Sequence, residues 1–171
     1  MSIMTVPRVV ALLLLAGSTA GCGEDRQAAI DCQSPPSIKR QIEACTRVIE
    51  DRPKSSMGYN NRCQAYNQAE DPARALPDCN MAIKLDPYNA SAYNNRGWAN
   101  ELRKQLDLAL KDYDKAVEIN PKLAVAYANR GDVYSKKGDR DRAIAEYRQA
   151  LTLEPDNDVA VGGLQKLGVK P

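Results

Sequence analysis

The chain has 171 residues, enough for one domain with a thin continuous core, and its 24 basic residues nearly balance its 22 acidic residues. That balance argues against a dedicated nucleic-acid-binding protein, which needs a strongly basic face. The sequence contains no histidine, so it lacks the commonest general base and the commonest metal ligand. We therefore expect no enzymatic activity, no cofactor and no metal site.

Residues 1–21 have the pattern of an export signal. Arg8 supplies the positive end, residues 9–16 form an apolar run, and small residues follow. The run is shorter than the roughly 20 residues that a membrane-spanning helix needs. Two cleavage sites compete: residues 18–20 (STA) fit ordinary signal peptidase, whereas residues 19–22 (TAGC) resemble the lipobox of bacterial lipoproteins, in which the cysteine is acylated and becomes the new N-terminus.

The cysteine count helps to separate these alternatives. The chain has five cysteines, and an unpaired thiol is a liability in the oxidising compartment that an exported protein reaches. If Cys22 carries a fatty acyl group such as palmitate, the other four can pair. The sequence therefore favours a periplasm-facing lipoprotein over a soluble periplasmic protein with a spare thiol. Gly23 follows the cysteine, where an aspartate would indicate retention in the inner membrane, so we expect attachment to the outer membrane.

The main feature of the remaining chain is a pattern that recurs every 34 residues. Small, aromatic, arginine and proline positions keep their spacing in three copies, at Tyr59, Arg62, Cys63, Ala75, Cys79, Ala82 and Pro87, then Tyr93, Arg96, Gly97, Ala109, Tyr113, Ala116 and Pro121, then Tyr127, Arg130, Gly131, Ala143, Tyr147, Ala150 and Pro155. A period of this length indicates stacked helix pairs. We predict helices over 56–69 and 72–85, 90–103 and 106–119, and 124–137 and 140–153, which gives repeat units 56–89, 90–123 and 124–157.

The segments on either side of the three units differ from them. Residues 22–36 are polar, lack helical periodicity and contain the Pro35-Pro36 pair, so we expect a tether. Residues 37–53 align with the second helix of a unit, which predicts a leading half-repeat whose first helix is missing. Residues 158–171 can form a capping helix for the last unit, weakened by Gly162-Gly163.

These units resemble the tetratricopeptide repeat (TPR), whose pattern of an aromatic residue, glycine, alanine, a second aromatic residue and proline is met by Tyr93, Gly97, Ala109, Tyr113 and Pro121. The resemblance implies an all-α, right-handed solenoid of antiparallel helix pairs and a non-catalytic protein–protein interaction adaptor. It also implies that the first helix of each unit lines a concave groove for a peptide or partner protein. Carried over position by position, the groove residues are Asn60, Asn61, Gln64, Asn94, Asn95, Trp98, Asn129 and Asp132.

Two groups of groove residues have competing interpretations. Asn61, Asn95 and Asn129 form a ladder at the repeat period, which suits hydrogen bonding to a peptide backbone, although asparagine can also be merely frequent there. Trp98 is either an anchor for the partner or a cover for the gap where Asn100 replaces the tyrosine of the pattern. The basic residues that grip acidic C-termini in chaperone-binding TPR proteins are absent at Asn60, Val125 and Asn129. An acidic C-terminal ligand is therefore disfavoured.

Aligned cysteines and charges suggest structural contacts within the repeats. Cys63 and Cys79 fall at facing positions of two helices, which suggests a Cys63–Cys79 disulfide. The remaining pair would be Cys32–Cys45, which would tie the end of the tether to the leading helix. Four cysteines allow three connectivities, and the alternative is that they are small apolar core residues. Arg62, Arg96 and Arg130 each have an acid sixteen residues later (Asp78, Asp112 and Glu146), and we interpret these as exposed, weak ion pairs.

The alternatives to an anchored adaptor are a structural oligomer that stacks end to end and a soluble periplasmic scaffold. The expected partners are a protein or peptide and, through lipid, a membrane.

Overall fold

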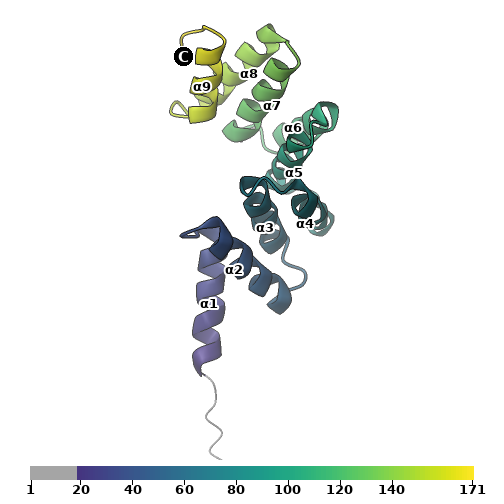
Figure 1. The fold of residues 1–171 in the computed structure, drawn as a ribbon, viewed down its shortest axis with the longest axis vertical. Helices are drawn as coiled ribbons and strands as arrows, with labels where there is room; N and C mark the ends of the chain where they lie inside the picture. Colours follow the sequence, from purple (N-terminus) through teal and green to yellow (C-terminus); the bar gives the residue numbers. More distant parts are fainter. Residues whose placement is uncertain (1–18) are drawn as a thin grey trace, which may run out of the picture.

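The computed structural model describes residues 19–171, with side chains from Arg26 onward. The predicted export signal up to Ser18 and the predicted acylation of Cys22 therefore lie outside what is described. Within this range the chain forms nine helices and no strand, and successive helices run antiparallel (Figure 1). The helices are Thr19–Gln33 (α1), Ile38–Asp51 (α2), Ser56–Gln68 (α3), Pro72–Leu85 (α4), Ala90–Leu102 (α5), Leu106–Ile119 (α6), Ala124–Lys136 (α7), Arg140–Leu153 (α8) and Asp158–Lys166 (α9).

Six of these helices are the ones that the 34-residue period predicts. α3 to α8 all begin at the predicted residues, and only α3, α5 and α7 end one residue early. A proline lies two residues beyond the ends of α4, α6 and α8 and prevents each helix from continuing. The pairs stack into a solenoid in which α3, α5, α7 and α9 contact one another along one side, while α4, α6 and α8 lie outside them (Figure 1).

The N-terminal end differs from the prediction. In place of a tether over 22–36 and a half-repeat over 37–53, α1 covers most of the tether and packs against α2 as a complete hairpin. A disulfide joins Cys32 to Cys45 across this hairpin, and Asp31 forms an ion pair with α2 at 2.7 Å. The sequence pattern missed α1 because its apolar residues do not recur at helical spacing. The covalent link and the ion pair take the place of a broad apolar face.

The turns inside the three regular hairpins share one backbone conformation. The residue after the C-cap has a positive φ in each: Gly138 at 79°, Glu70 at 54° and Lys104 at 61°. Only glycine adopts this region without strain, and other residues incur a cost of about 1–2 kcal/mol. The first two units lack a glycine at this position. Their turns thus have the same backbone conformation as the turn of the third unit, but a strained residue adopts it.

Small residues set the distance between the two helices of each unit. A Cβ atom on Gly97 would lie 2.6 Å from the Tyr113 ring, and one on Gly131 would lie 2.8 Å from Tyr147. The capping helix α9 uses the same device, because a Cβ atom on Gly163 would lie 2.3 Å from the Tyr147 ring. The second glycine of the pair in α9 therefore allows the cap to approach closely.

We predict opposite effects from alanine at the two adjacent glycines of α9. Gly162 faces open space and lies inside the helix, so Gly162→Ala should raise the free energy of unfolding by roughly 0.5–1 kcal/mol. Gly163→Ala should lower it by about 1–3 kcal/mol, because the new methyl group overlaps the Tyr147 ring. Urea unfolding of both variants is the measurement, and equal effects would contradict this account of the cap.

Candidate functional site

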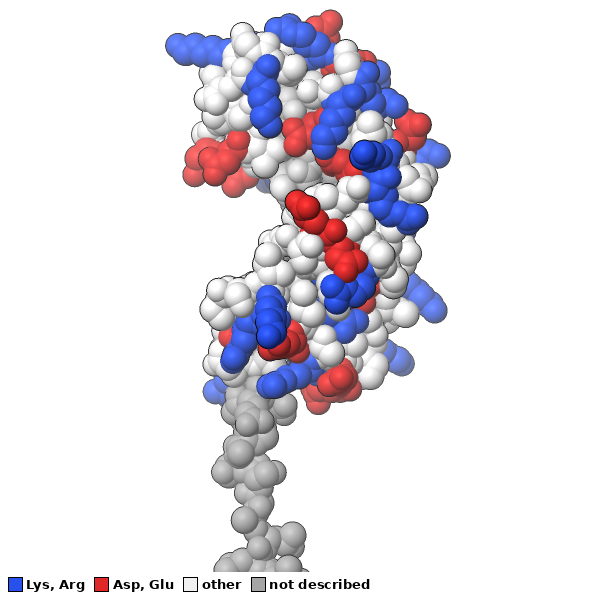
Figure 2. All heavy atoms as spheres, viewed as in Figure 1, with Lys and Arg blue, Asp and Glu red and all other residues white. Residues whose placement is uncertain are grey.

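The concave side of the solenoid contains a groove of about 460 Å³. The first helices of the three units and the capping helix line it, through Asn60, Asn61 and Gln64 of α3, Ser91, Asn94, Asn95 and Trp98 of α5, Val125 and Asn129 of α7, and Val159 of α9. In Figure 2 this side is the indentation on the left, with acidic side chains on its upper edge. The repeat period therefore brings residues from four helices, distant in sequence, around one hollow.

Seven of the eight groove residues expected from the sequence line this hollow, and Asp132 does not. Its carboxylate oxygen Oδ1 accepts a hydrogen bond from the Tyr147 hydroxyl at 2.6 Å, so the side chain is occupied within its own unit. Three lining residues were not among the eight: Val125, which was expected only as a position without a basic residue, and Ser91 and Val159, which were not expected in the groove. Val159 was unpredictable from the repeat period because it belongs to the capping helix.

The asparagines of the groove bond to one another from unit to unit. Asn95 Nδ2 donates to Asn60 Oδ1 at 3.0 Å, and Asn129 Nδ2 donates to Asn94 Oδ1 at the same distance. Within α3, Asn60 Nδ2 donates to Asn61 Oδ1 at 3.2 Å. Asn95 is only 6% exposed as a result. These bonds form the floor of the groove and differ from the predicted ladder, because Asn95 and Asn129 bond to Asn60 and Asn94 of the preceding units and not to one another. The more open amides for a ligand are those of Asn61 and Asn129.

An apolar patch lies above this floor. Trp98, Val125 and Val159 line the groove from three different helices. Trp98 does not fill a gap at Asn100, because Asn100 is buried and its Nδ2 donates to Asp112 Oδ2 at 2.9 Å. The geometry therefore favours the interpretation of Trp98 as a half-buried side chain that faces the groove.

The groove contains no charged side chain among the residues that line it in the described part of the chain. Its polar groups are neutral amides and one hydroxyl, which can donate and accept hydrogen bonds but cannot neutralise an ionic ligand. Burying a carboxylate here would leave it unpaired, which is costly. The groove is therefore suited to an uncharged polypeptide segment.

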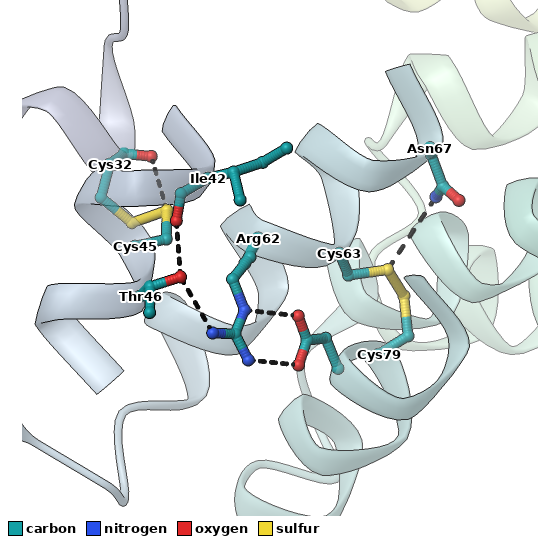
Figure 3. A network of polar contacts seen from close by, with 9 residues as sticks. Cys32, Ile42, Cys45, Thr46, Arg62, Cys63, Asn67 and Cys79 are labelled. Carbon is teal, nitrogen blue, oxygen red and sulfur yellow. Dashed lines mark hydrogen bonds and ion pairs between the residues drawn. A yellow bond between two sulfur atoms is a disulfide. The ribbon is translucent and has the colours of Figure 1, made fainter. Parts of the chain in front are cut away.

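Arginines at the repeat period connect the helices behind the groove, which we call the wall. Arg62 donates through Nε and Nη2 to both oxygens of Asp78, at 2.7 and 2.8 Å, and its Nη1 donates to Thr46 of the preceding hairpin at 3.1 Å. Figure 3 shows the Arg62 guanidinium between Thr46 and a carboxylate that is drawn without a label. The bidentate contact to Asp78 raises the pKa of Arg62.

The same arrangement recurs in the next two units. Arg96 contacts Asp112 of its own hairpin and Asn80 of the preceding one, at 2.6 and 2.9 Å. Arg130 contacts Glu146 and Asp114 in the same way. The acids are not exposed as the sequence prediction assumed, since the side chain of Asp112 is 8% exposed. The contacts to Asn80 and Asp114 join successive hairpins. The partly buried ion pairs within each hairpin contribute more than free surface ion pairs.

Both disulfides lie in the N-terminal half of the structure. Cys63 and Cys79 join α3 to α4 where the later units have a glycine and a tyrosine, and Cys32 and Cys45 join α1 to α2 (Figure 3). These are the pairings that the sequence suggested. Next to the second bridge, Asn67 Nδ2 donates to the backbone oxygen of Asn95 at 2.7 Å. The cross-linked hairpin is thereby attached to the helix that contains Trp98.

Two buried tyrosines lie between the helices of the later units. Desolvation raises the pKa of Tyr113 well above its usual value, and the Tyr113 hydroxyl donates to Glu101 at 2.8 Å. Burial raises the pKa of Tyr147 in the same direction. Both hydroxyls stay protonated as hydrogen-bond donors, which is a structural arrangement rather than an acid–base site.

Two further properties concern only residues 19–171. Among the side chains described, from Arg26 onward, no cluster of three or more potential ligands among histidine, cysteine, aspartate and glutamate is arranged to hold a metal ion. None of the helices within residues 19–171 has the length and apolar character needed to cross a bilayer.

Models of known protein families match within the repeat units. Family models of the tetratricopeptide repeat match residues 90–123 and 124–157. A model of the protein prenyltransferase alpha subunit repeat matches residues 72–102, which span α4 and α5 from two neighbouring units. No curated protein matches the chain.

Solved structures show the same architecture over most of the chain. The TPR domain of Arabidopsis OM64 is 30% identical, with 67% of this chain and 94% of that domain covered and a TM-score of 0.63. The first TPR domain of Spaghetti (RPAP3), bound to the HSP90 peptide SRMEEVD, is 26% identical over 66% of this chain and 92% of that one, also at 0.63. A thermophilic TPR protein of Thermus thermophilus, TTC0263, shares the fold at 18% identity, with 86% and 82% covered and a TM-score of 0.72.

We predict that the groove wall depends on the arginine contacts. Arg96→Ala leaves the buried Asp112 carboxylate without its cation, so the free energy of unfolding should fall by about 1–3 kcal/mol. Arg103→Ala is the matched control, because Arg103 is exposed and forms no ion pair with the described residues. Chemical denaturation measures both, and an Arg96→Ala variant as stable as the Arg103→Ala control would contradict the structural role.

Proposed function

The chain belongs to the tetratricopeptide repeat family, and from this premise we propose that it is a non-catalytic adaptor that binds an uncharged, extended segment of a partner protein in its concave groove. The observation that supports this most directly is the composition of the groove: a floor of neutral amides beneath Trp98, Val125 and Val159. A similar TPR domain binds a peptide, as the Spaghetti (RPAP3) complex shows for that protein.

The chemistry of the groove defines the ligand more closely. Asn61 and Asn129 lie about one repeat on either side of Trp98 and can each donate to and accept from the backbone of an extended chain. Trp98 and the two valines form an apolar surface for one or two aliphatic or aromatic side chains of that segment. A peptide such as SRMEEVD, with three carboxylate side chains, would meet no cation here. We therefore infer a ligand of different chemistry from the one in the Spaghetti complex.

A catalytic role is not supported by the groove. Its side chains are amides, a hydroxyl, an indole and two aliphatic groups, so it offers neither a general base near neutral pH nor an activated nucleophile. The ionised groups near it are paired in the wall behind. Binding is the activity that the arrangement can provide.

We predict that Trp98→Ala weakens capture of the partner without unfolding the protein. An aromatic anchor of this kind contributes about 2 kcal/mol, which corresponds to roughly thirtyfold in affinity. The melting temperature should stay nearly unchanged, because Trp98 lines the groove and is not among the buried residues of the core. Tyr88→Ala is the control, since Tyr88 is an aromatic residue that is 82% exposed outside the groove.

The partner for this measurement can be obtained by crosslinking in intact cells. A benzoylphenylalanine in place of Val125 puts the reactive group at the edge of the groove, where the native side chain is 37% exposed. The same group in place of Tyr88 is the reference. A product that forms equally from both positions, or from Tyr88 alone, would argue against the groove.

We also propose that the adaptor is an envelope lipoprotein anchored through Cys22, with attachment to the outer membrane. The sequence of residues 1–22 supports this, and so does the cysteine count, because the other four cysteines are used in two disulfides. α1 then replaces the flexible tether of the sequence prediction. The helical segment from position 22 to Cys32 would span about 15 Å, so the repeats would stand close to the bilayer on a stiff support.

The lipid proposal has a direct test by mass. Protein extracted from membranes should have an intact mass equal to the chain from Cys22 onward plus a diacylglyceryl group and an N-acyl chain. Cys22→Ser should release the protein into the soluble periplasmic fraction. A mature N-terminus at Gly21 with an unmodified thiol would show that ordinary signal peptidase acts instead.

A further inference from the structure

The unit formed by α5 and α6 lacks a surface contact that both neighbouring units make. In the unit of α3 and α4, the guanidinium of Arg74 lies 4.7 Å from the centre of the Tyr66 ring, and its Nε donates to Asp71. In the unit of α7 and α8, Arg142 lies 4.5 Å from the ring of Tyr134 and donates to Asp139.

These three side chains close the corner where the second helix begins. The aspartate also caps that helix, because its side chain accepts from the backbone nitrogen of the arginine three residues later, at 3.1 Å in α4 and 3.2 Å in α8. The arginine bond lowers the pKa of both aspartates, Asp71 and Asp139. We call this tyrosine, arginine and aspartate arrangement the corner stack.

All three members of the corner stack are replaced in the middle unit. At the repeat period, Asn100 stands for the tyrosine, Leu108 for the arginine and Gln105 for the aspartate. Asn100 turns inward to Asp112, Gln105 makes no capping bond to α6, and Leu108 is left 46% exposed. The result is a hollow of about 520 Å³ on the outer side of the solenoid, lined by all three replacements together with Leu76 of α4.

The charged side chains at the rim of this outer hollow that form no ion pair are both positive. Arg103 and Lys111 line it and are exposed, and neither has an ion-pair partner within the described range of the chain. The only carboxylate on the wall, Asp112, is already bound to Arg96. Two cations without a close ion pair thus flank two leucines, although the hydrogen bond from Lys137 and, more weakly, the charge of Lys111 lower the pKa of the nearby Asp107. A segment with an apolar side chain between carboxylates complements that surface.

From these observations we propose that the outer hollow is a second interaction site, which binds an acidic amphipathic segment of a partner protein. An apolar side chain of that segment enters between Leu76 and Leu108, and its carboxylates contact Arg103 and Lys111. The N-terminal residues 1–18 of this chain cannot be the occupant in this way, because they contain Arg8 and no acidic residue. The proposal goes beyond the groove, since it concerns the opposite face and a ligand of opposite character.

The test uses a variant in which the corner stack is rebuilt. Asn100→Tyr, Gln105→Asp and Leu108→Arg together introduce the residues of the neighbouring units, so the hollow is filled by side chains for which the fold already has a place. A displayed library of random dodecapeptides is selected on the chain from Cys22 onward, with counter-selection on this triple variant. We expect the enriched peptides to contain leucine or phenylalanine flanked by aspartate and glutamate.

Affinity of the enriched peptides, measured by fluorescence anisotropy, then examines each part of the site. The triple variant should abolish binding, and Arg103→Glu with Lys111→Glu should weaken it by about tenfold or more. Lys122→Glu with Lys166→Glu is the charge-matched control, because both lysines are exposed and lie outside the hollow, and it should have little effect. Trp98→Ala should leave this binding unchanged, so failure of the groove and failure of the outer site are distinguishable.

Several results would overturn the proposal. Enrichment of basic or uncharged peptides, or no enrichment against the triple variant, would show that the hollow does not select an acidic amphipathic segment. Self-association of the native chain that the triple variant abolishes would assign the hollow to contacts between copies. Binding to phosphatidylglycerol vesicles that depends on Leu108, without binding to the peptides, would assign it to anionic lipid.

Discussion

The arginine that recurs at the repeat period is the contact on which the assembly of hairpins depends. Each guanidinium has one partner in the second helix of its own unit and another in the second helix of the preceding unit. It also lies over a tyrosine one turn earlier, at 5.3 to 5.9 Å from the ring centre. One side chain therefore sets both the packing within a hairpin and the rotation between hairpins. The acids are partly buried, so the geometry is specified more strongly than by exposed ion pairs.

The ion pairs lie in the wall and not on the concave side, which explains why no charged side chain lines the groove in the described part of the chain. The ionised groups are concentrated in the wall, where they satisfy one another, and the first helices present amides on the concave side. The amides bond in pairs from unit to unit, Asn60 with Asn95 and Asn94 with Asn129. An amide that is already bonded on one side keeps a fixed orientation, so its remaining donor or acceptor is preorganised for a ligand.

The sequence predicted the helices that follow the repeat period, but not the features that depend on individual side-chain contacts. Six helix starts follow from the spacing of glycine, tyrosine and proline, because those positions are where backbones approach or must stop. α1 was missed because a disulfide and an ion pair replace the apolar face that a pattern would show. Asp132 was assigned to the groove by position alone, and a hydroxyl on the facing helix holds it elsewhere. Val159 enters the groove from a helix outside the repeat, so no alignment of repeats could place it.

In the middle unit, the residues at positions 98, 105 and 108 lack contacts that the equivalent residues make within one or both of the neighbouring units. Position 132 in the last unit accepts a hydrogen bond from the buried tyrosine, but the equivalent Trp98 has no acceptor, and the hydroxyl of Tyr113 bonds to Glu101 instead. The buried Tyr113 hydroxyl therefore still has a hydrogen-bond acceptor, and Trp98 is free to face the groove. Asn100 similarly satisfies itself against Asp112, which leaves the outer corner open. Both departures lie close together on α5 and on opposite faces. A single helix, held rigidly between two regular units, thus provides the distinctive residues of both surfaces.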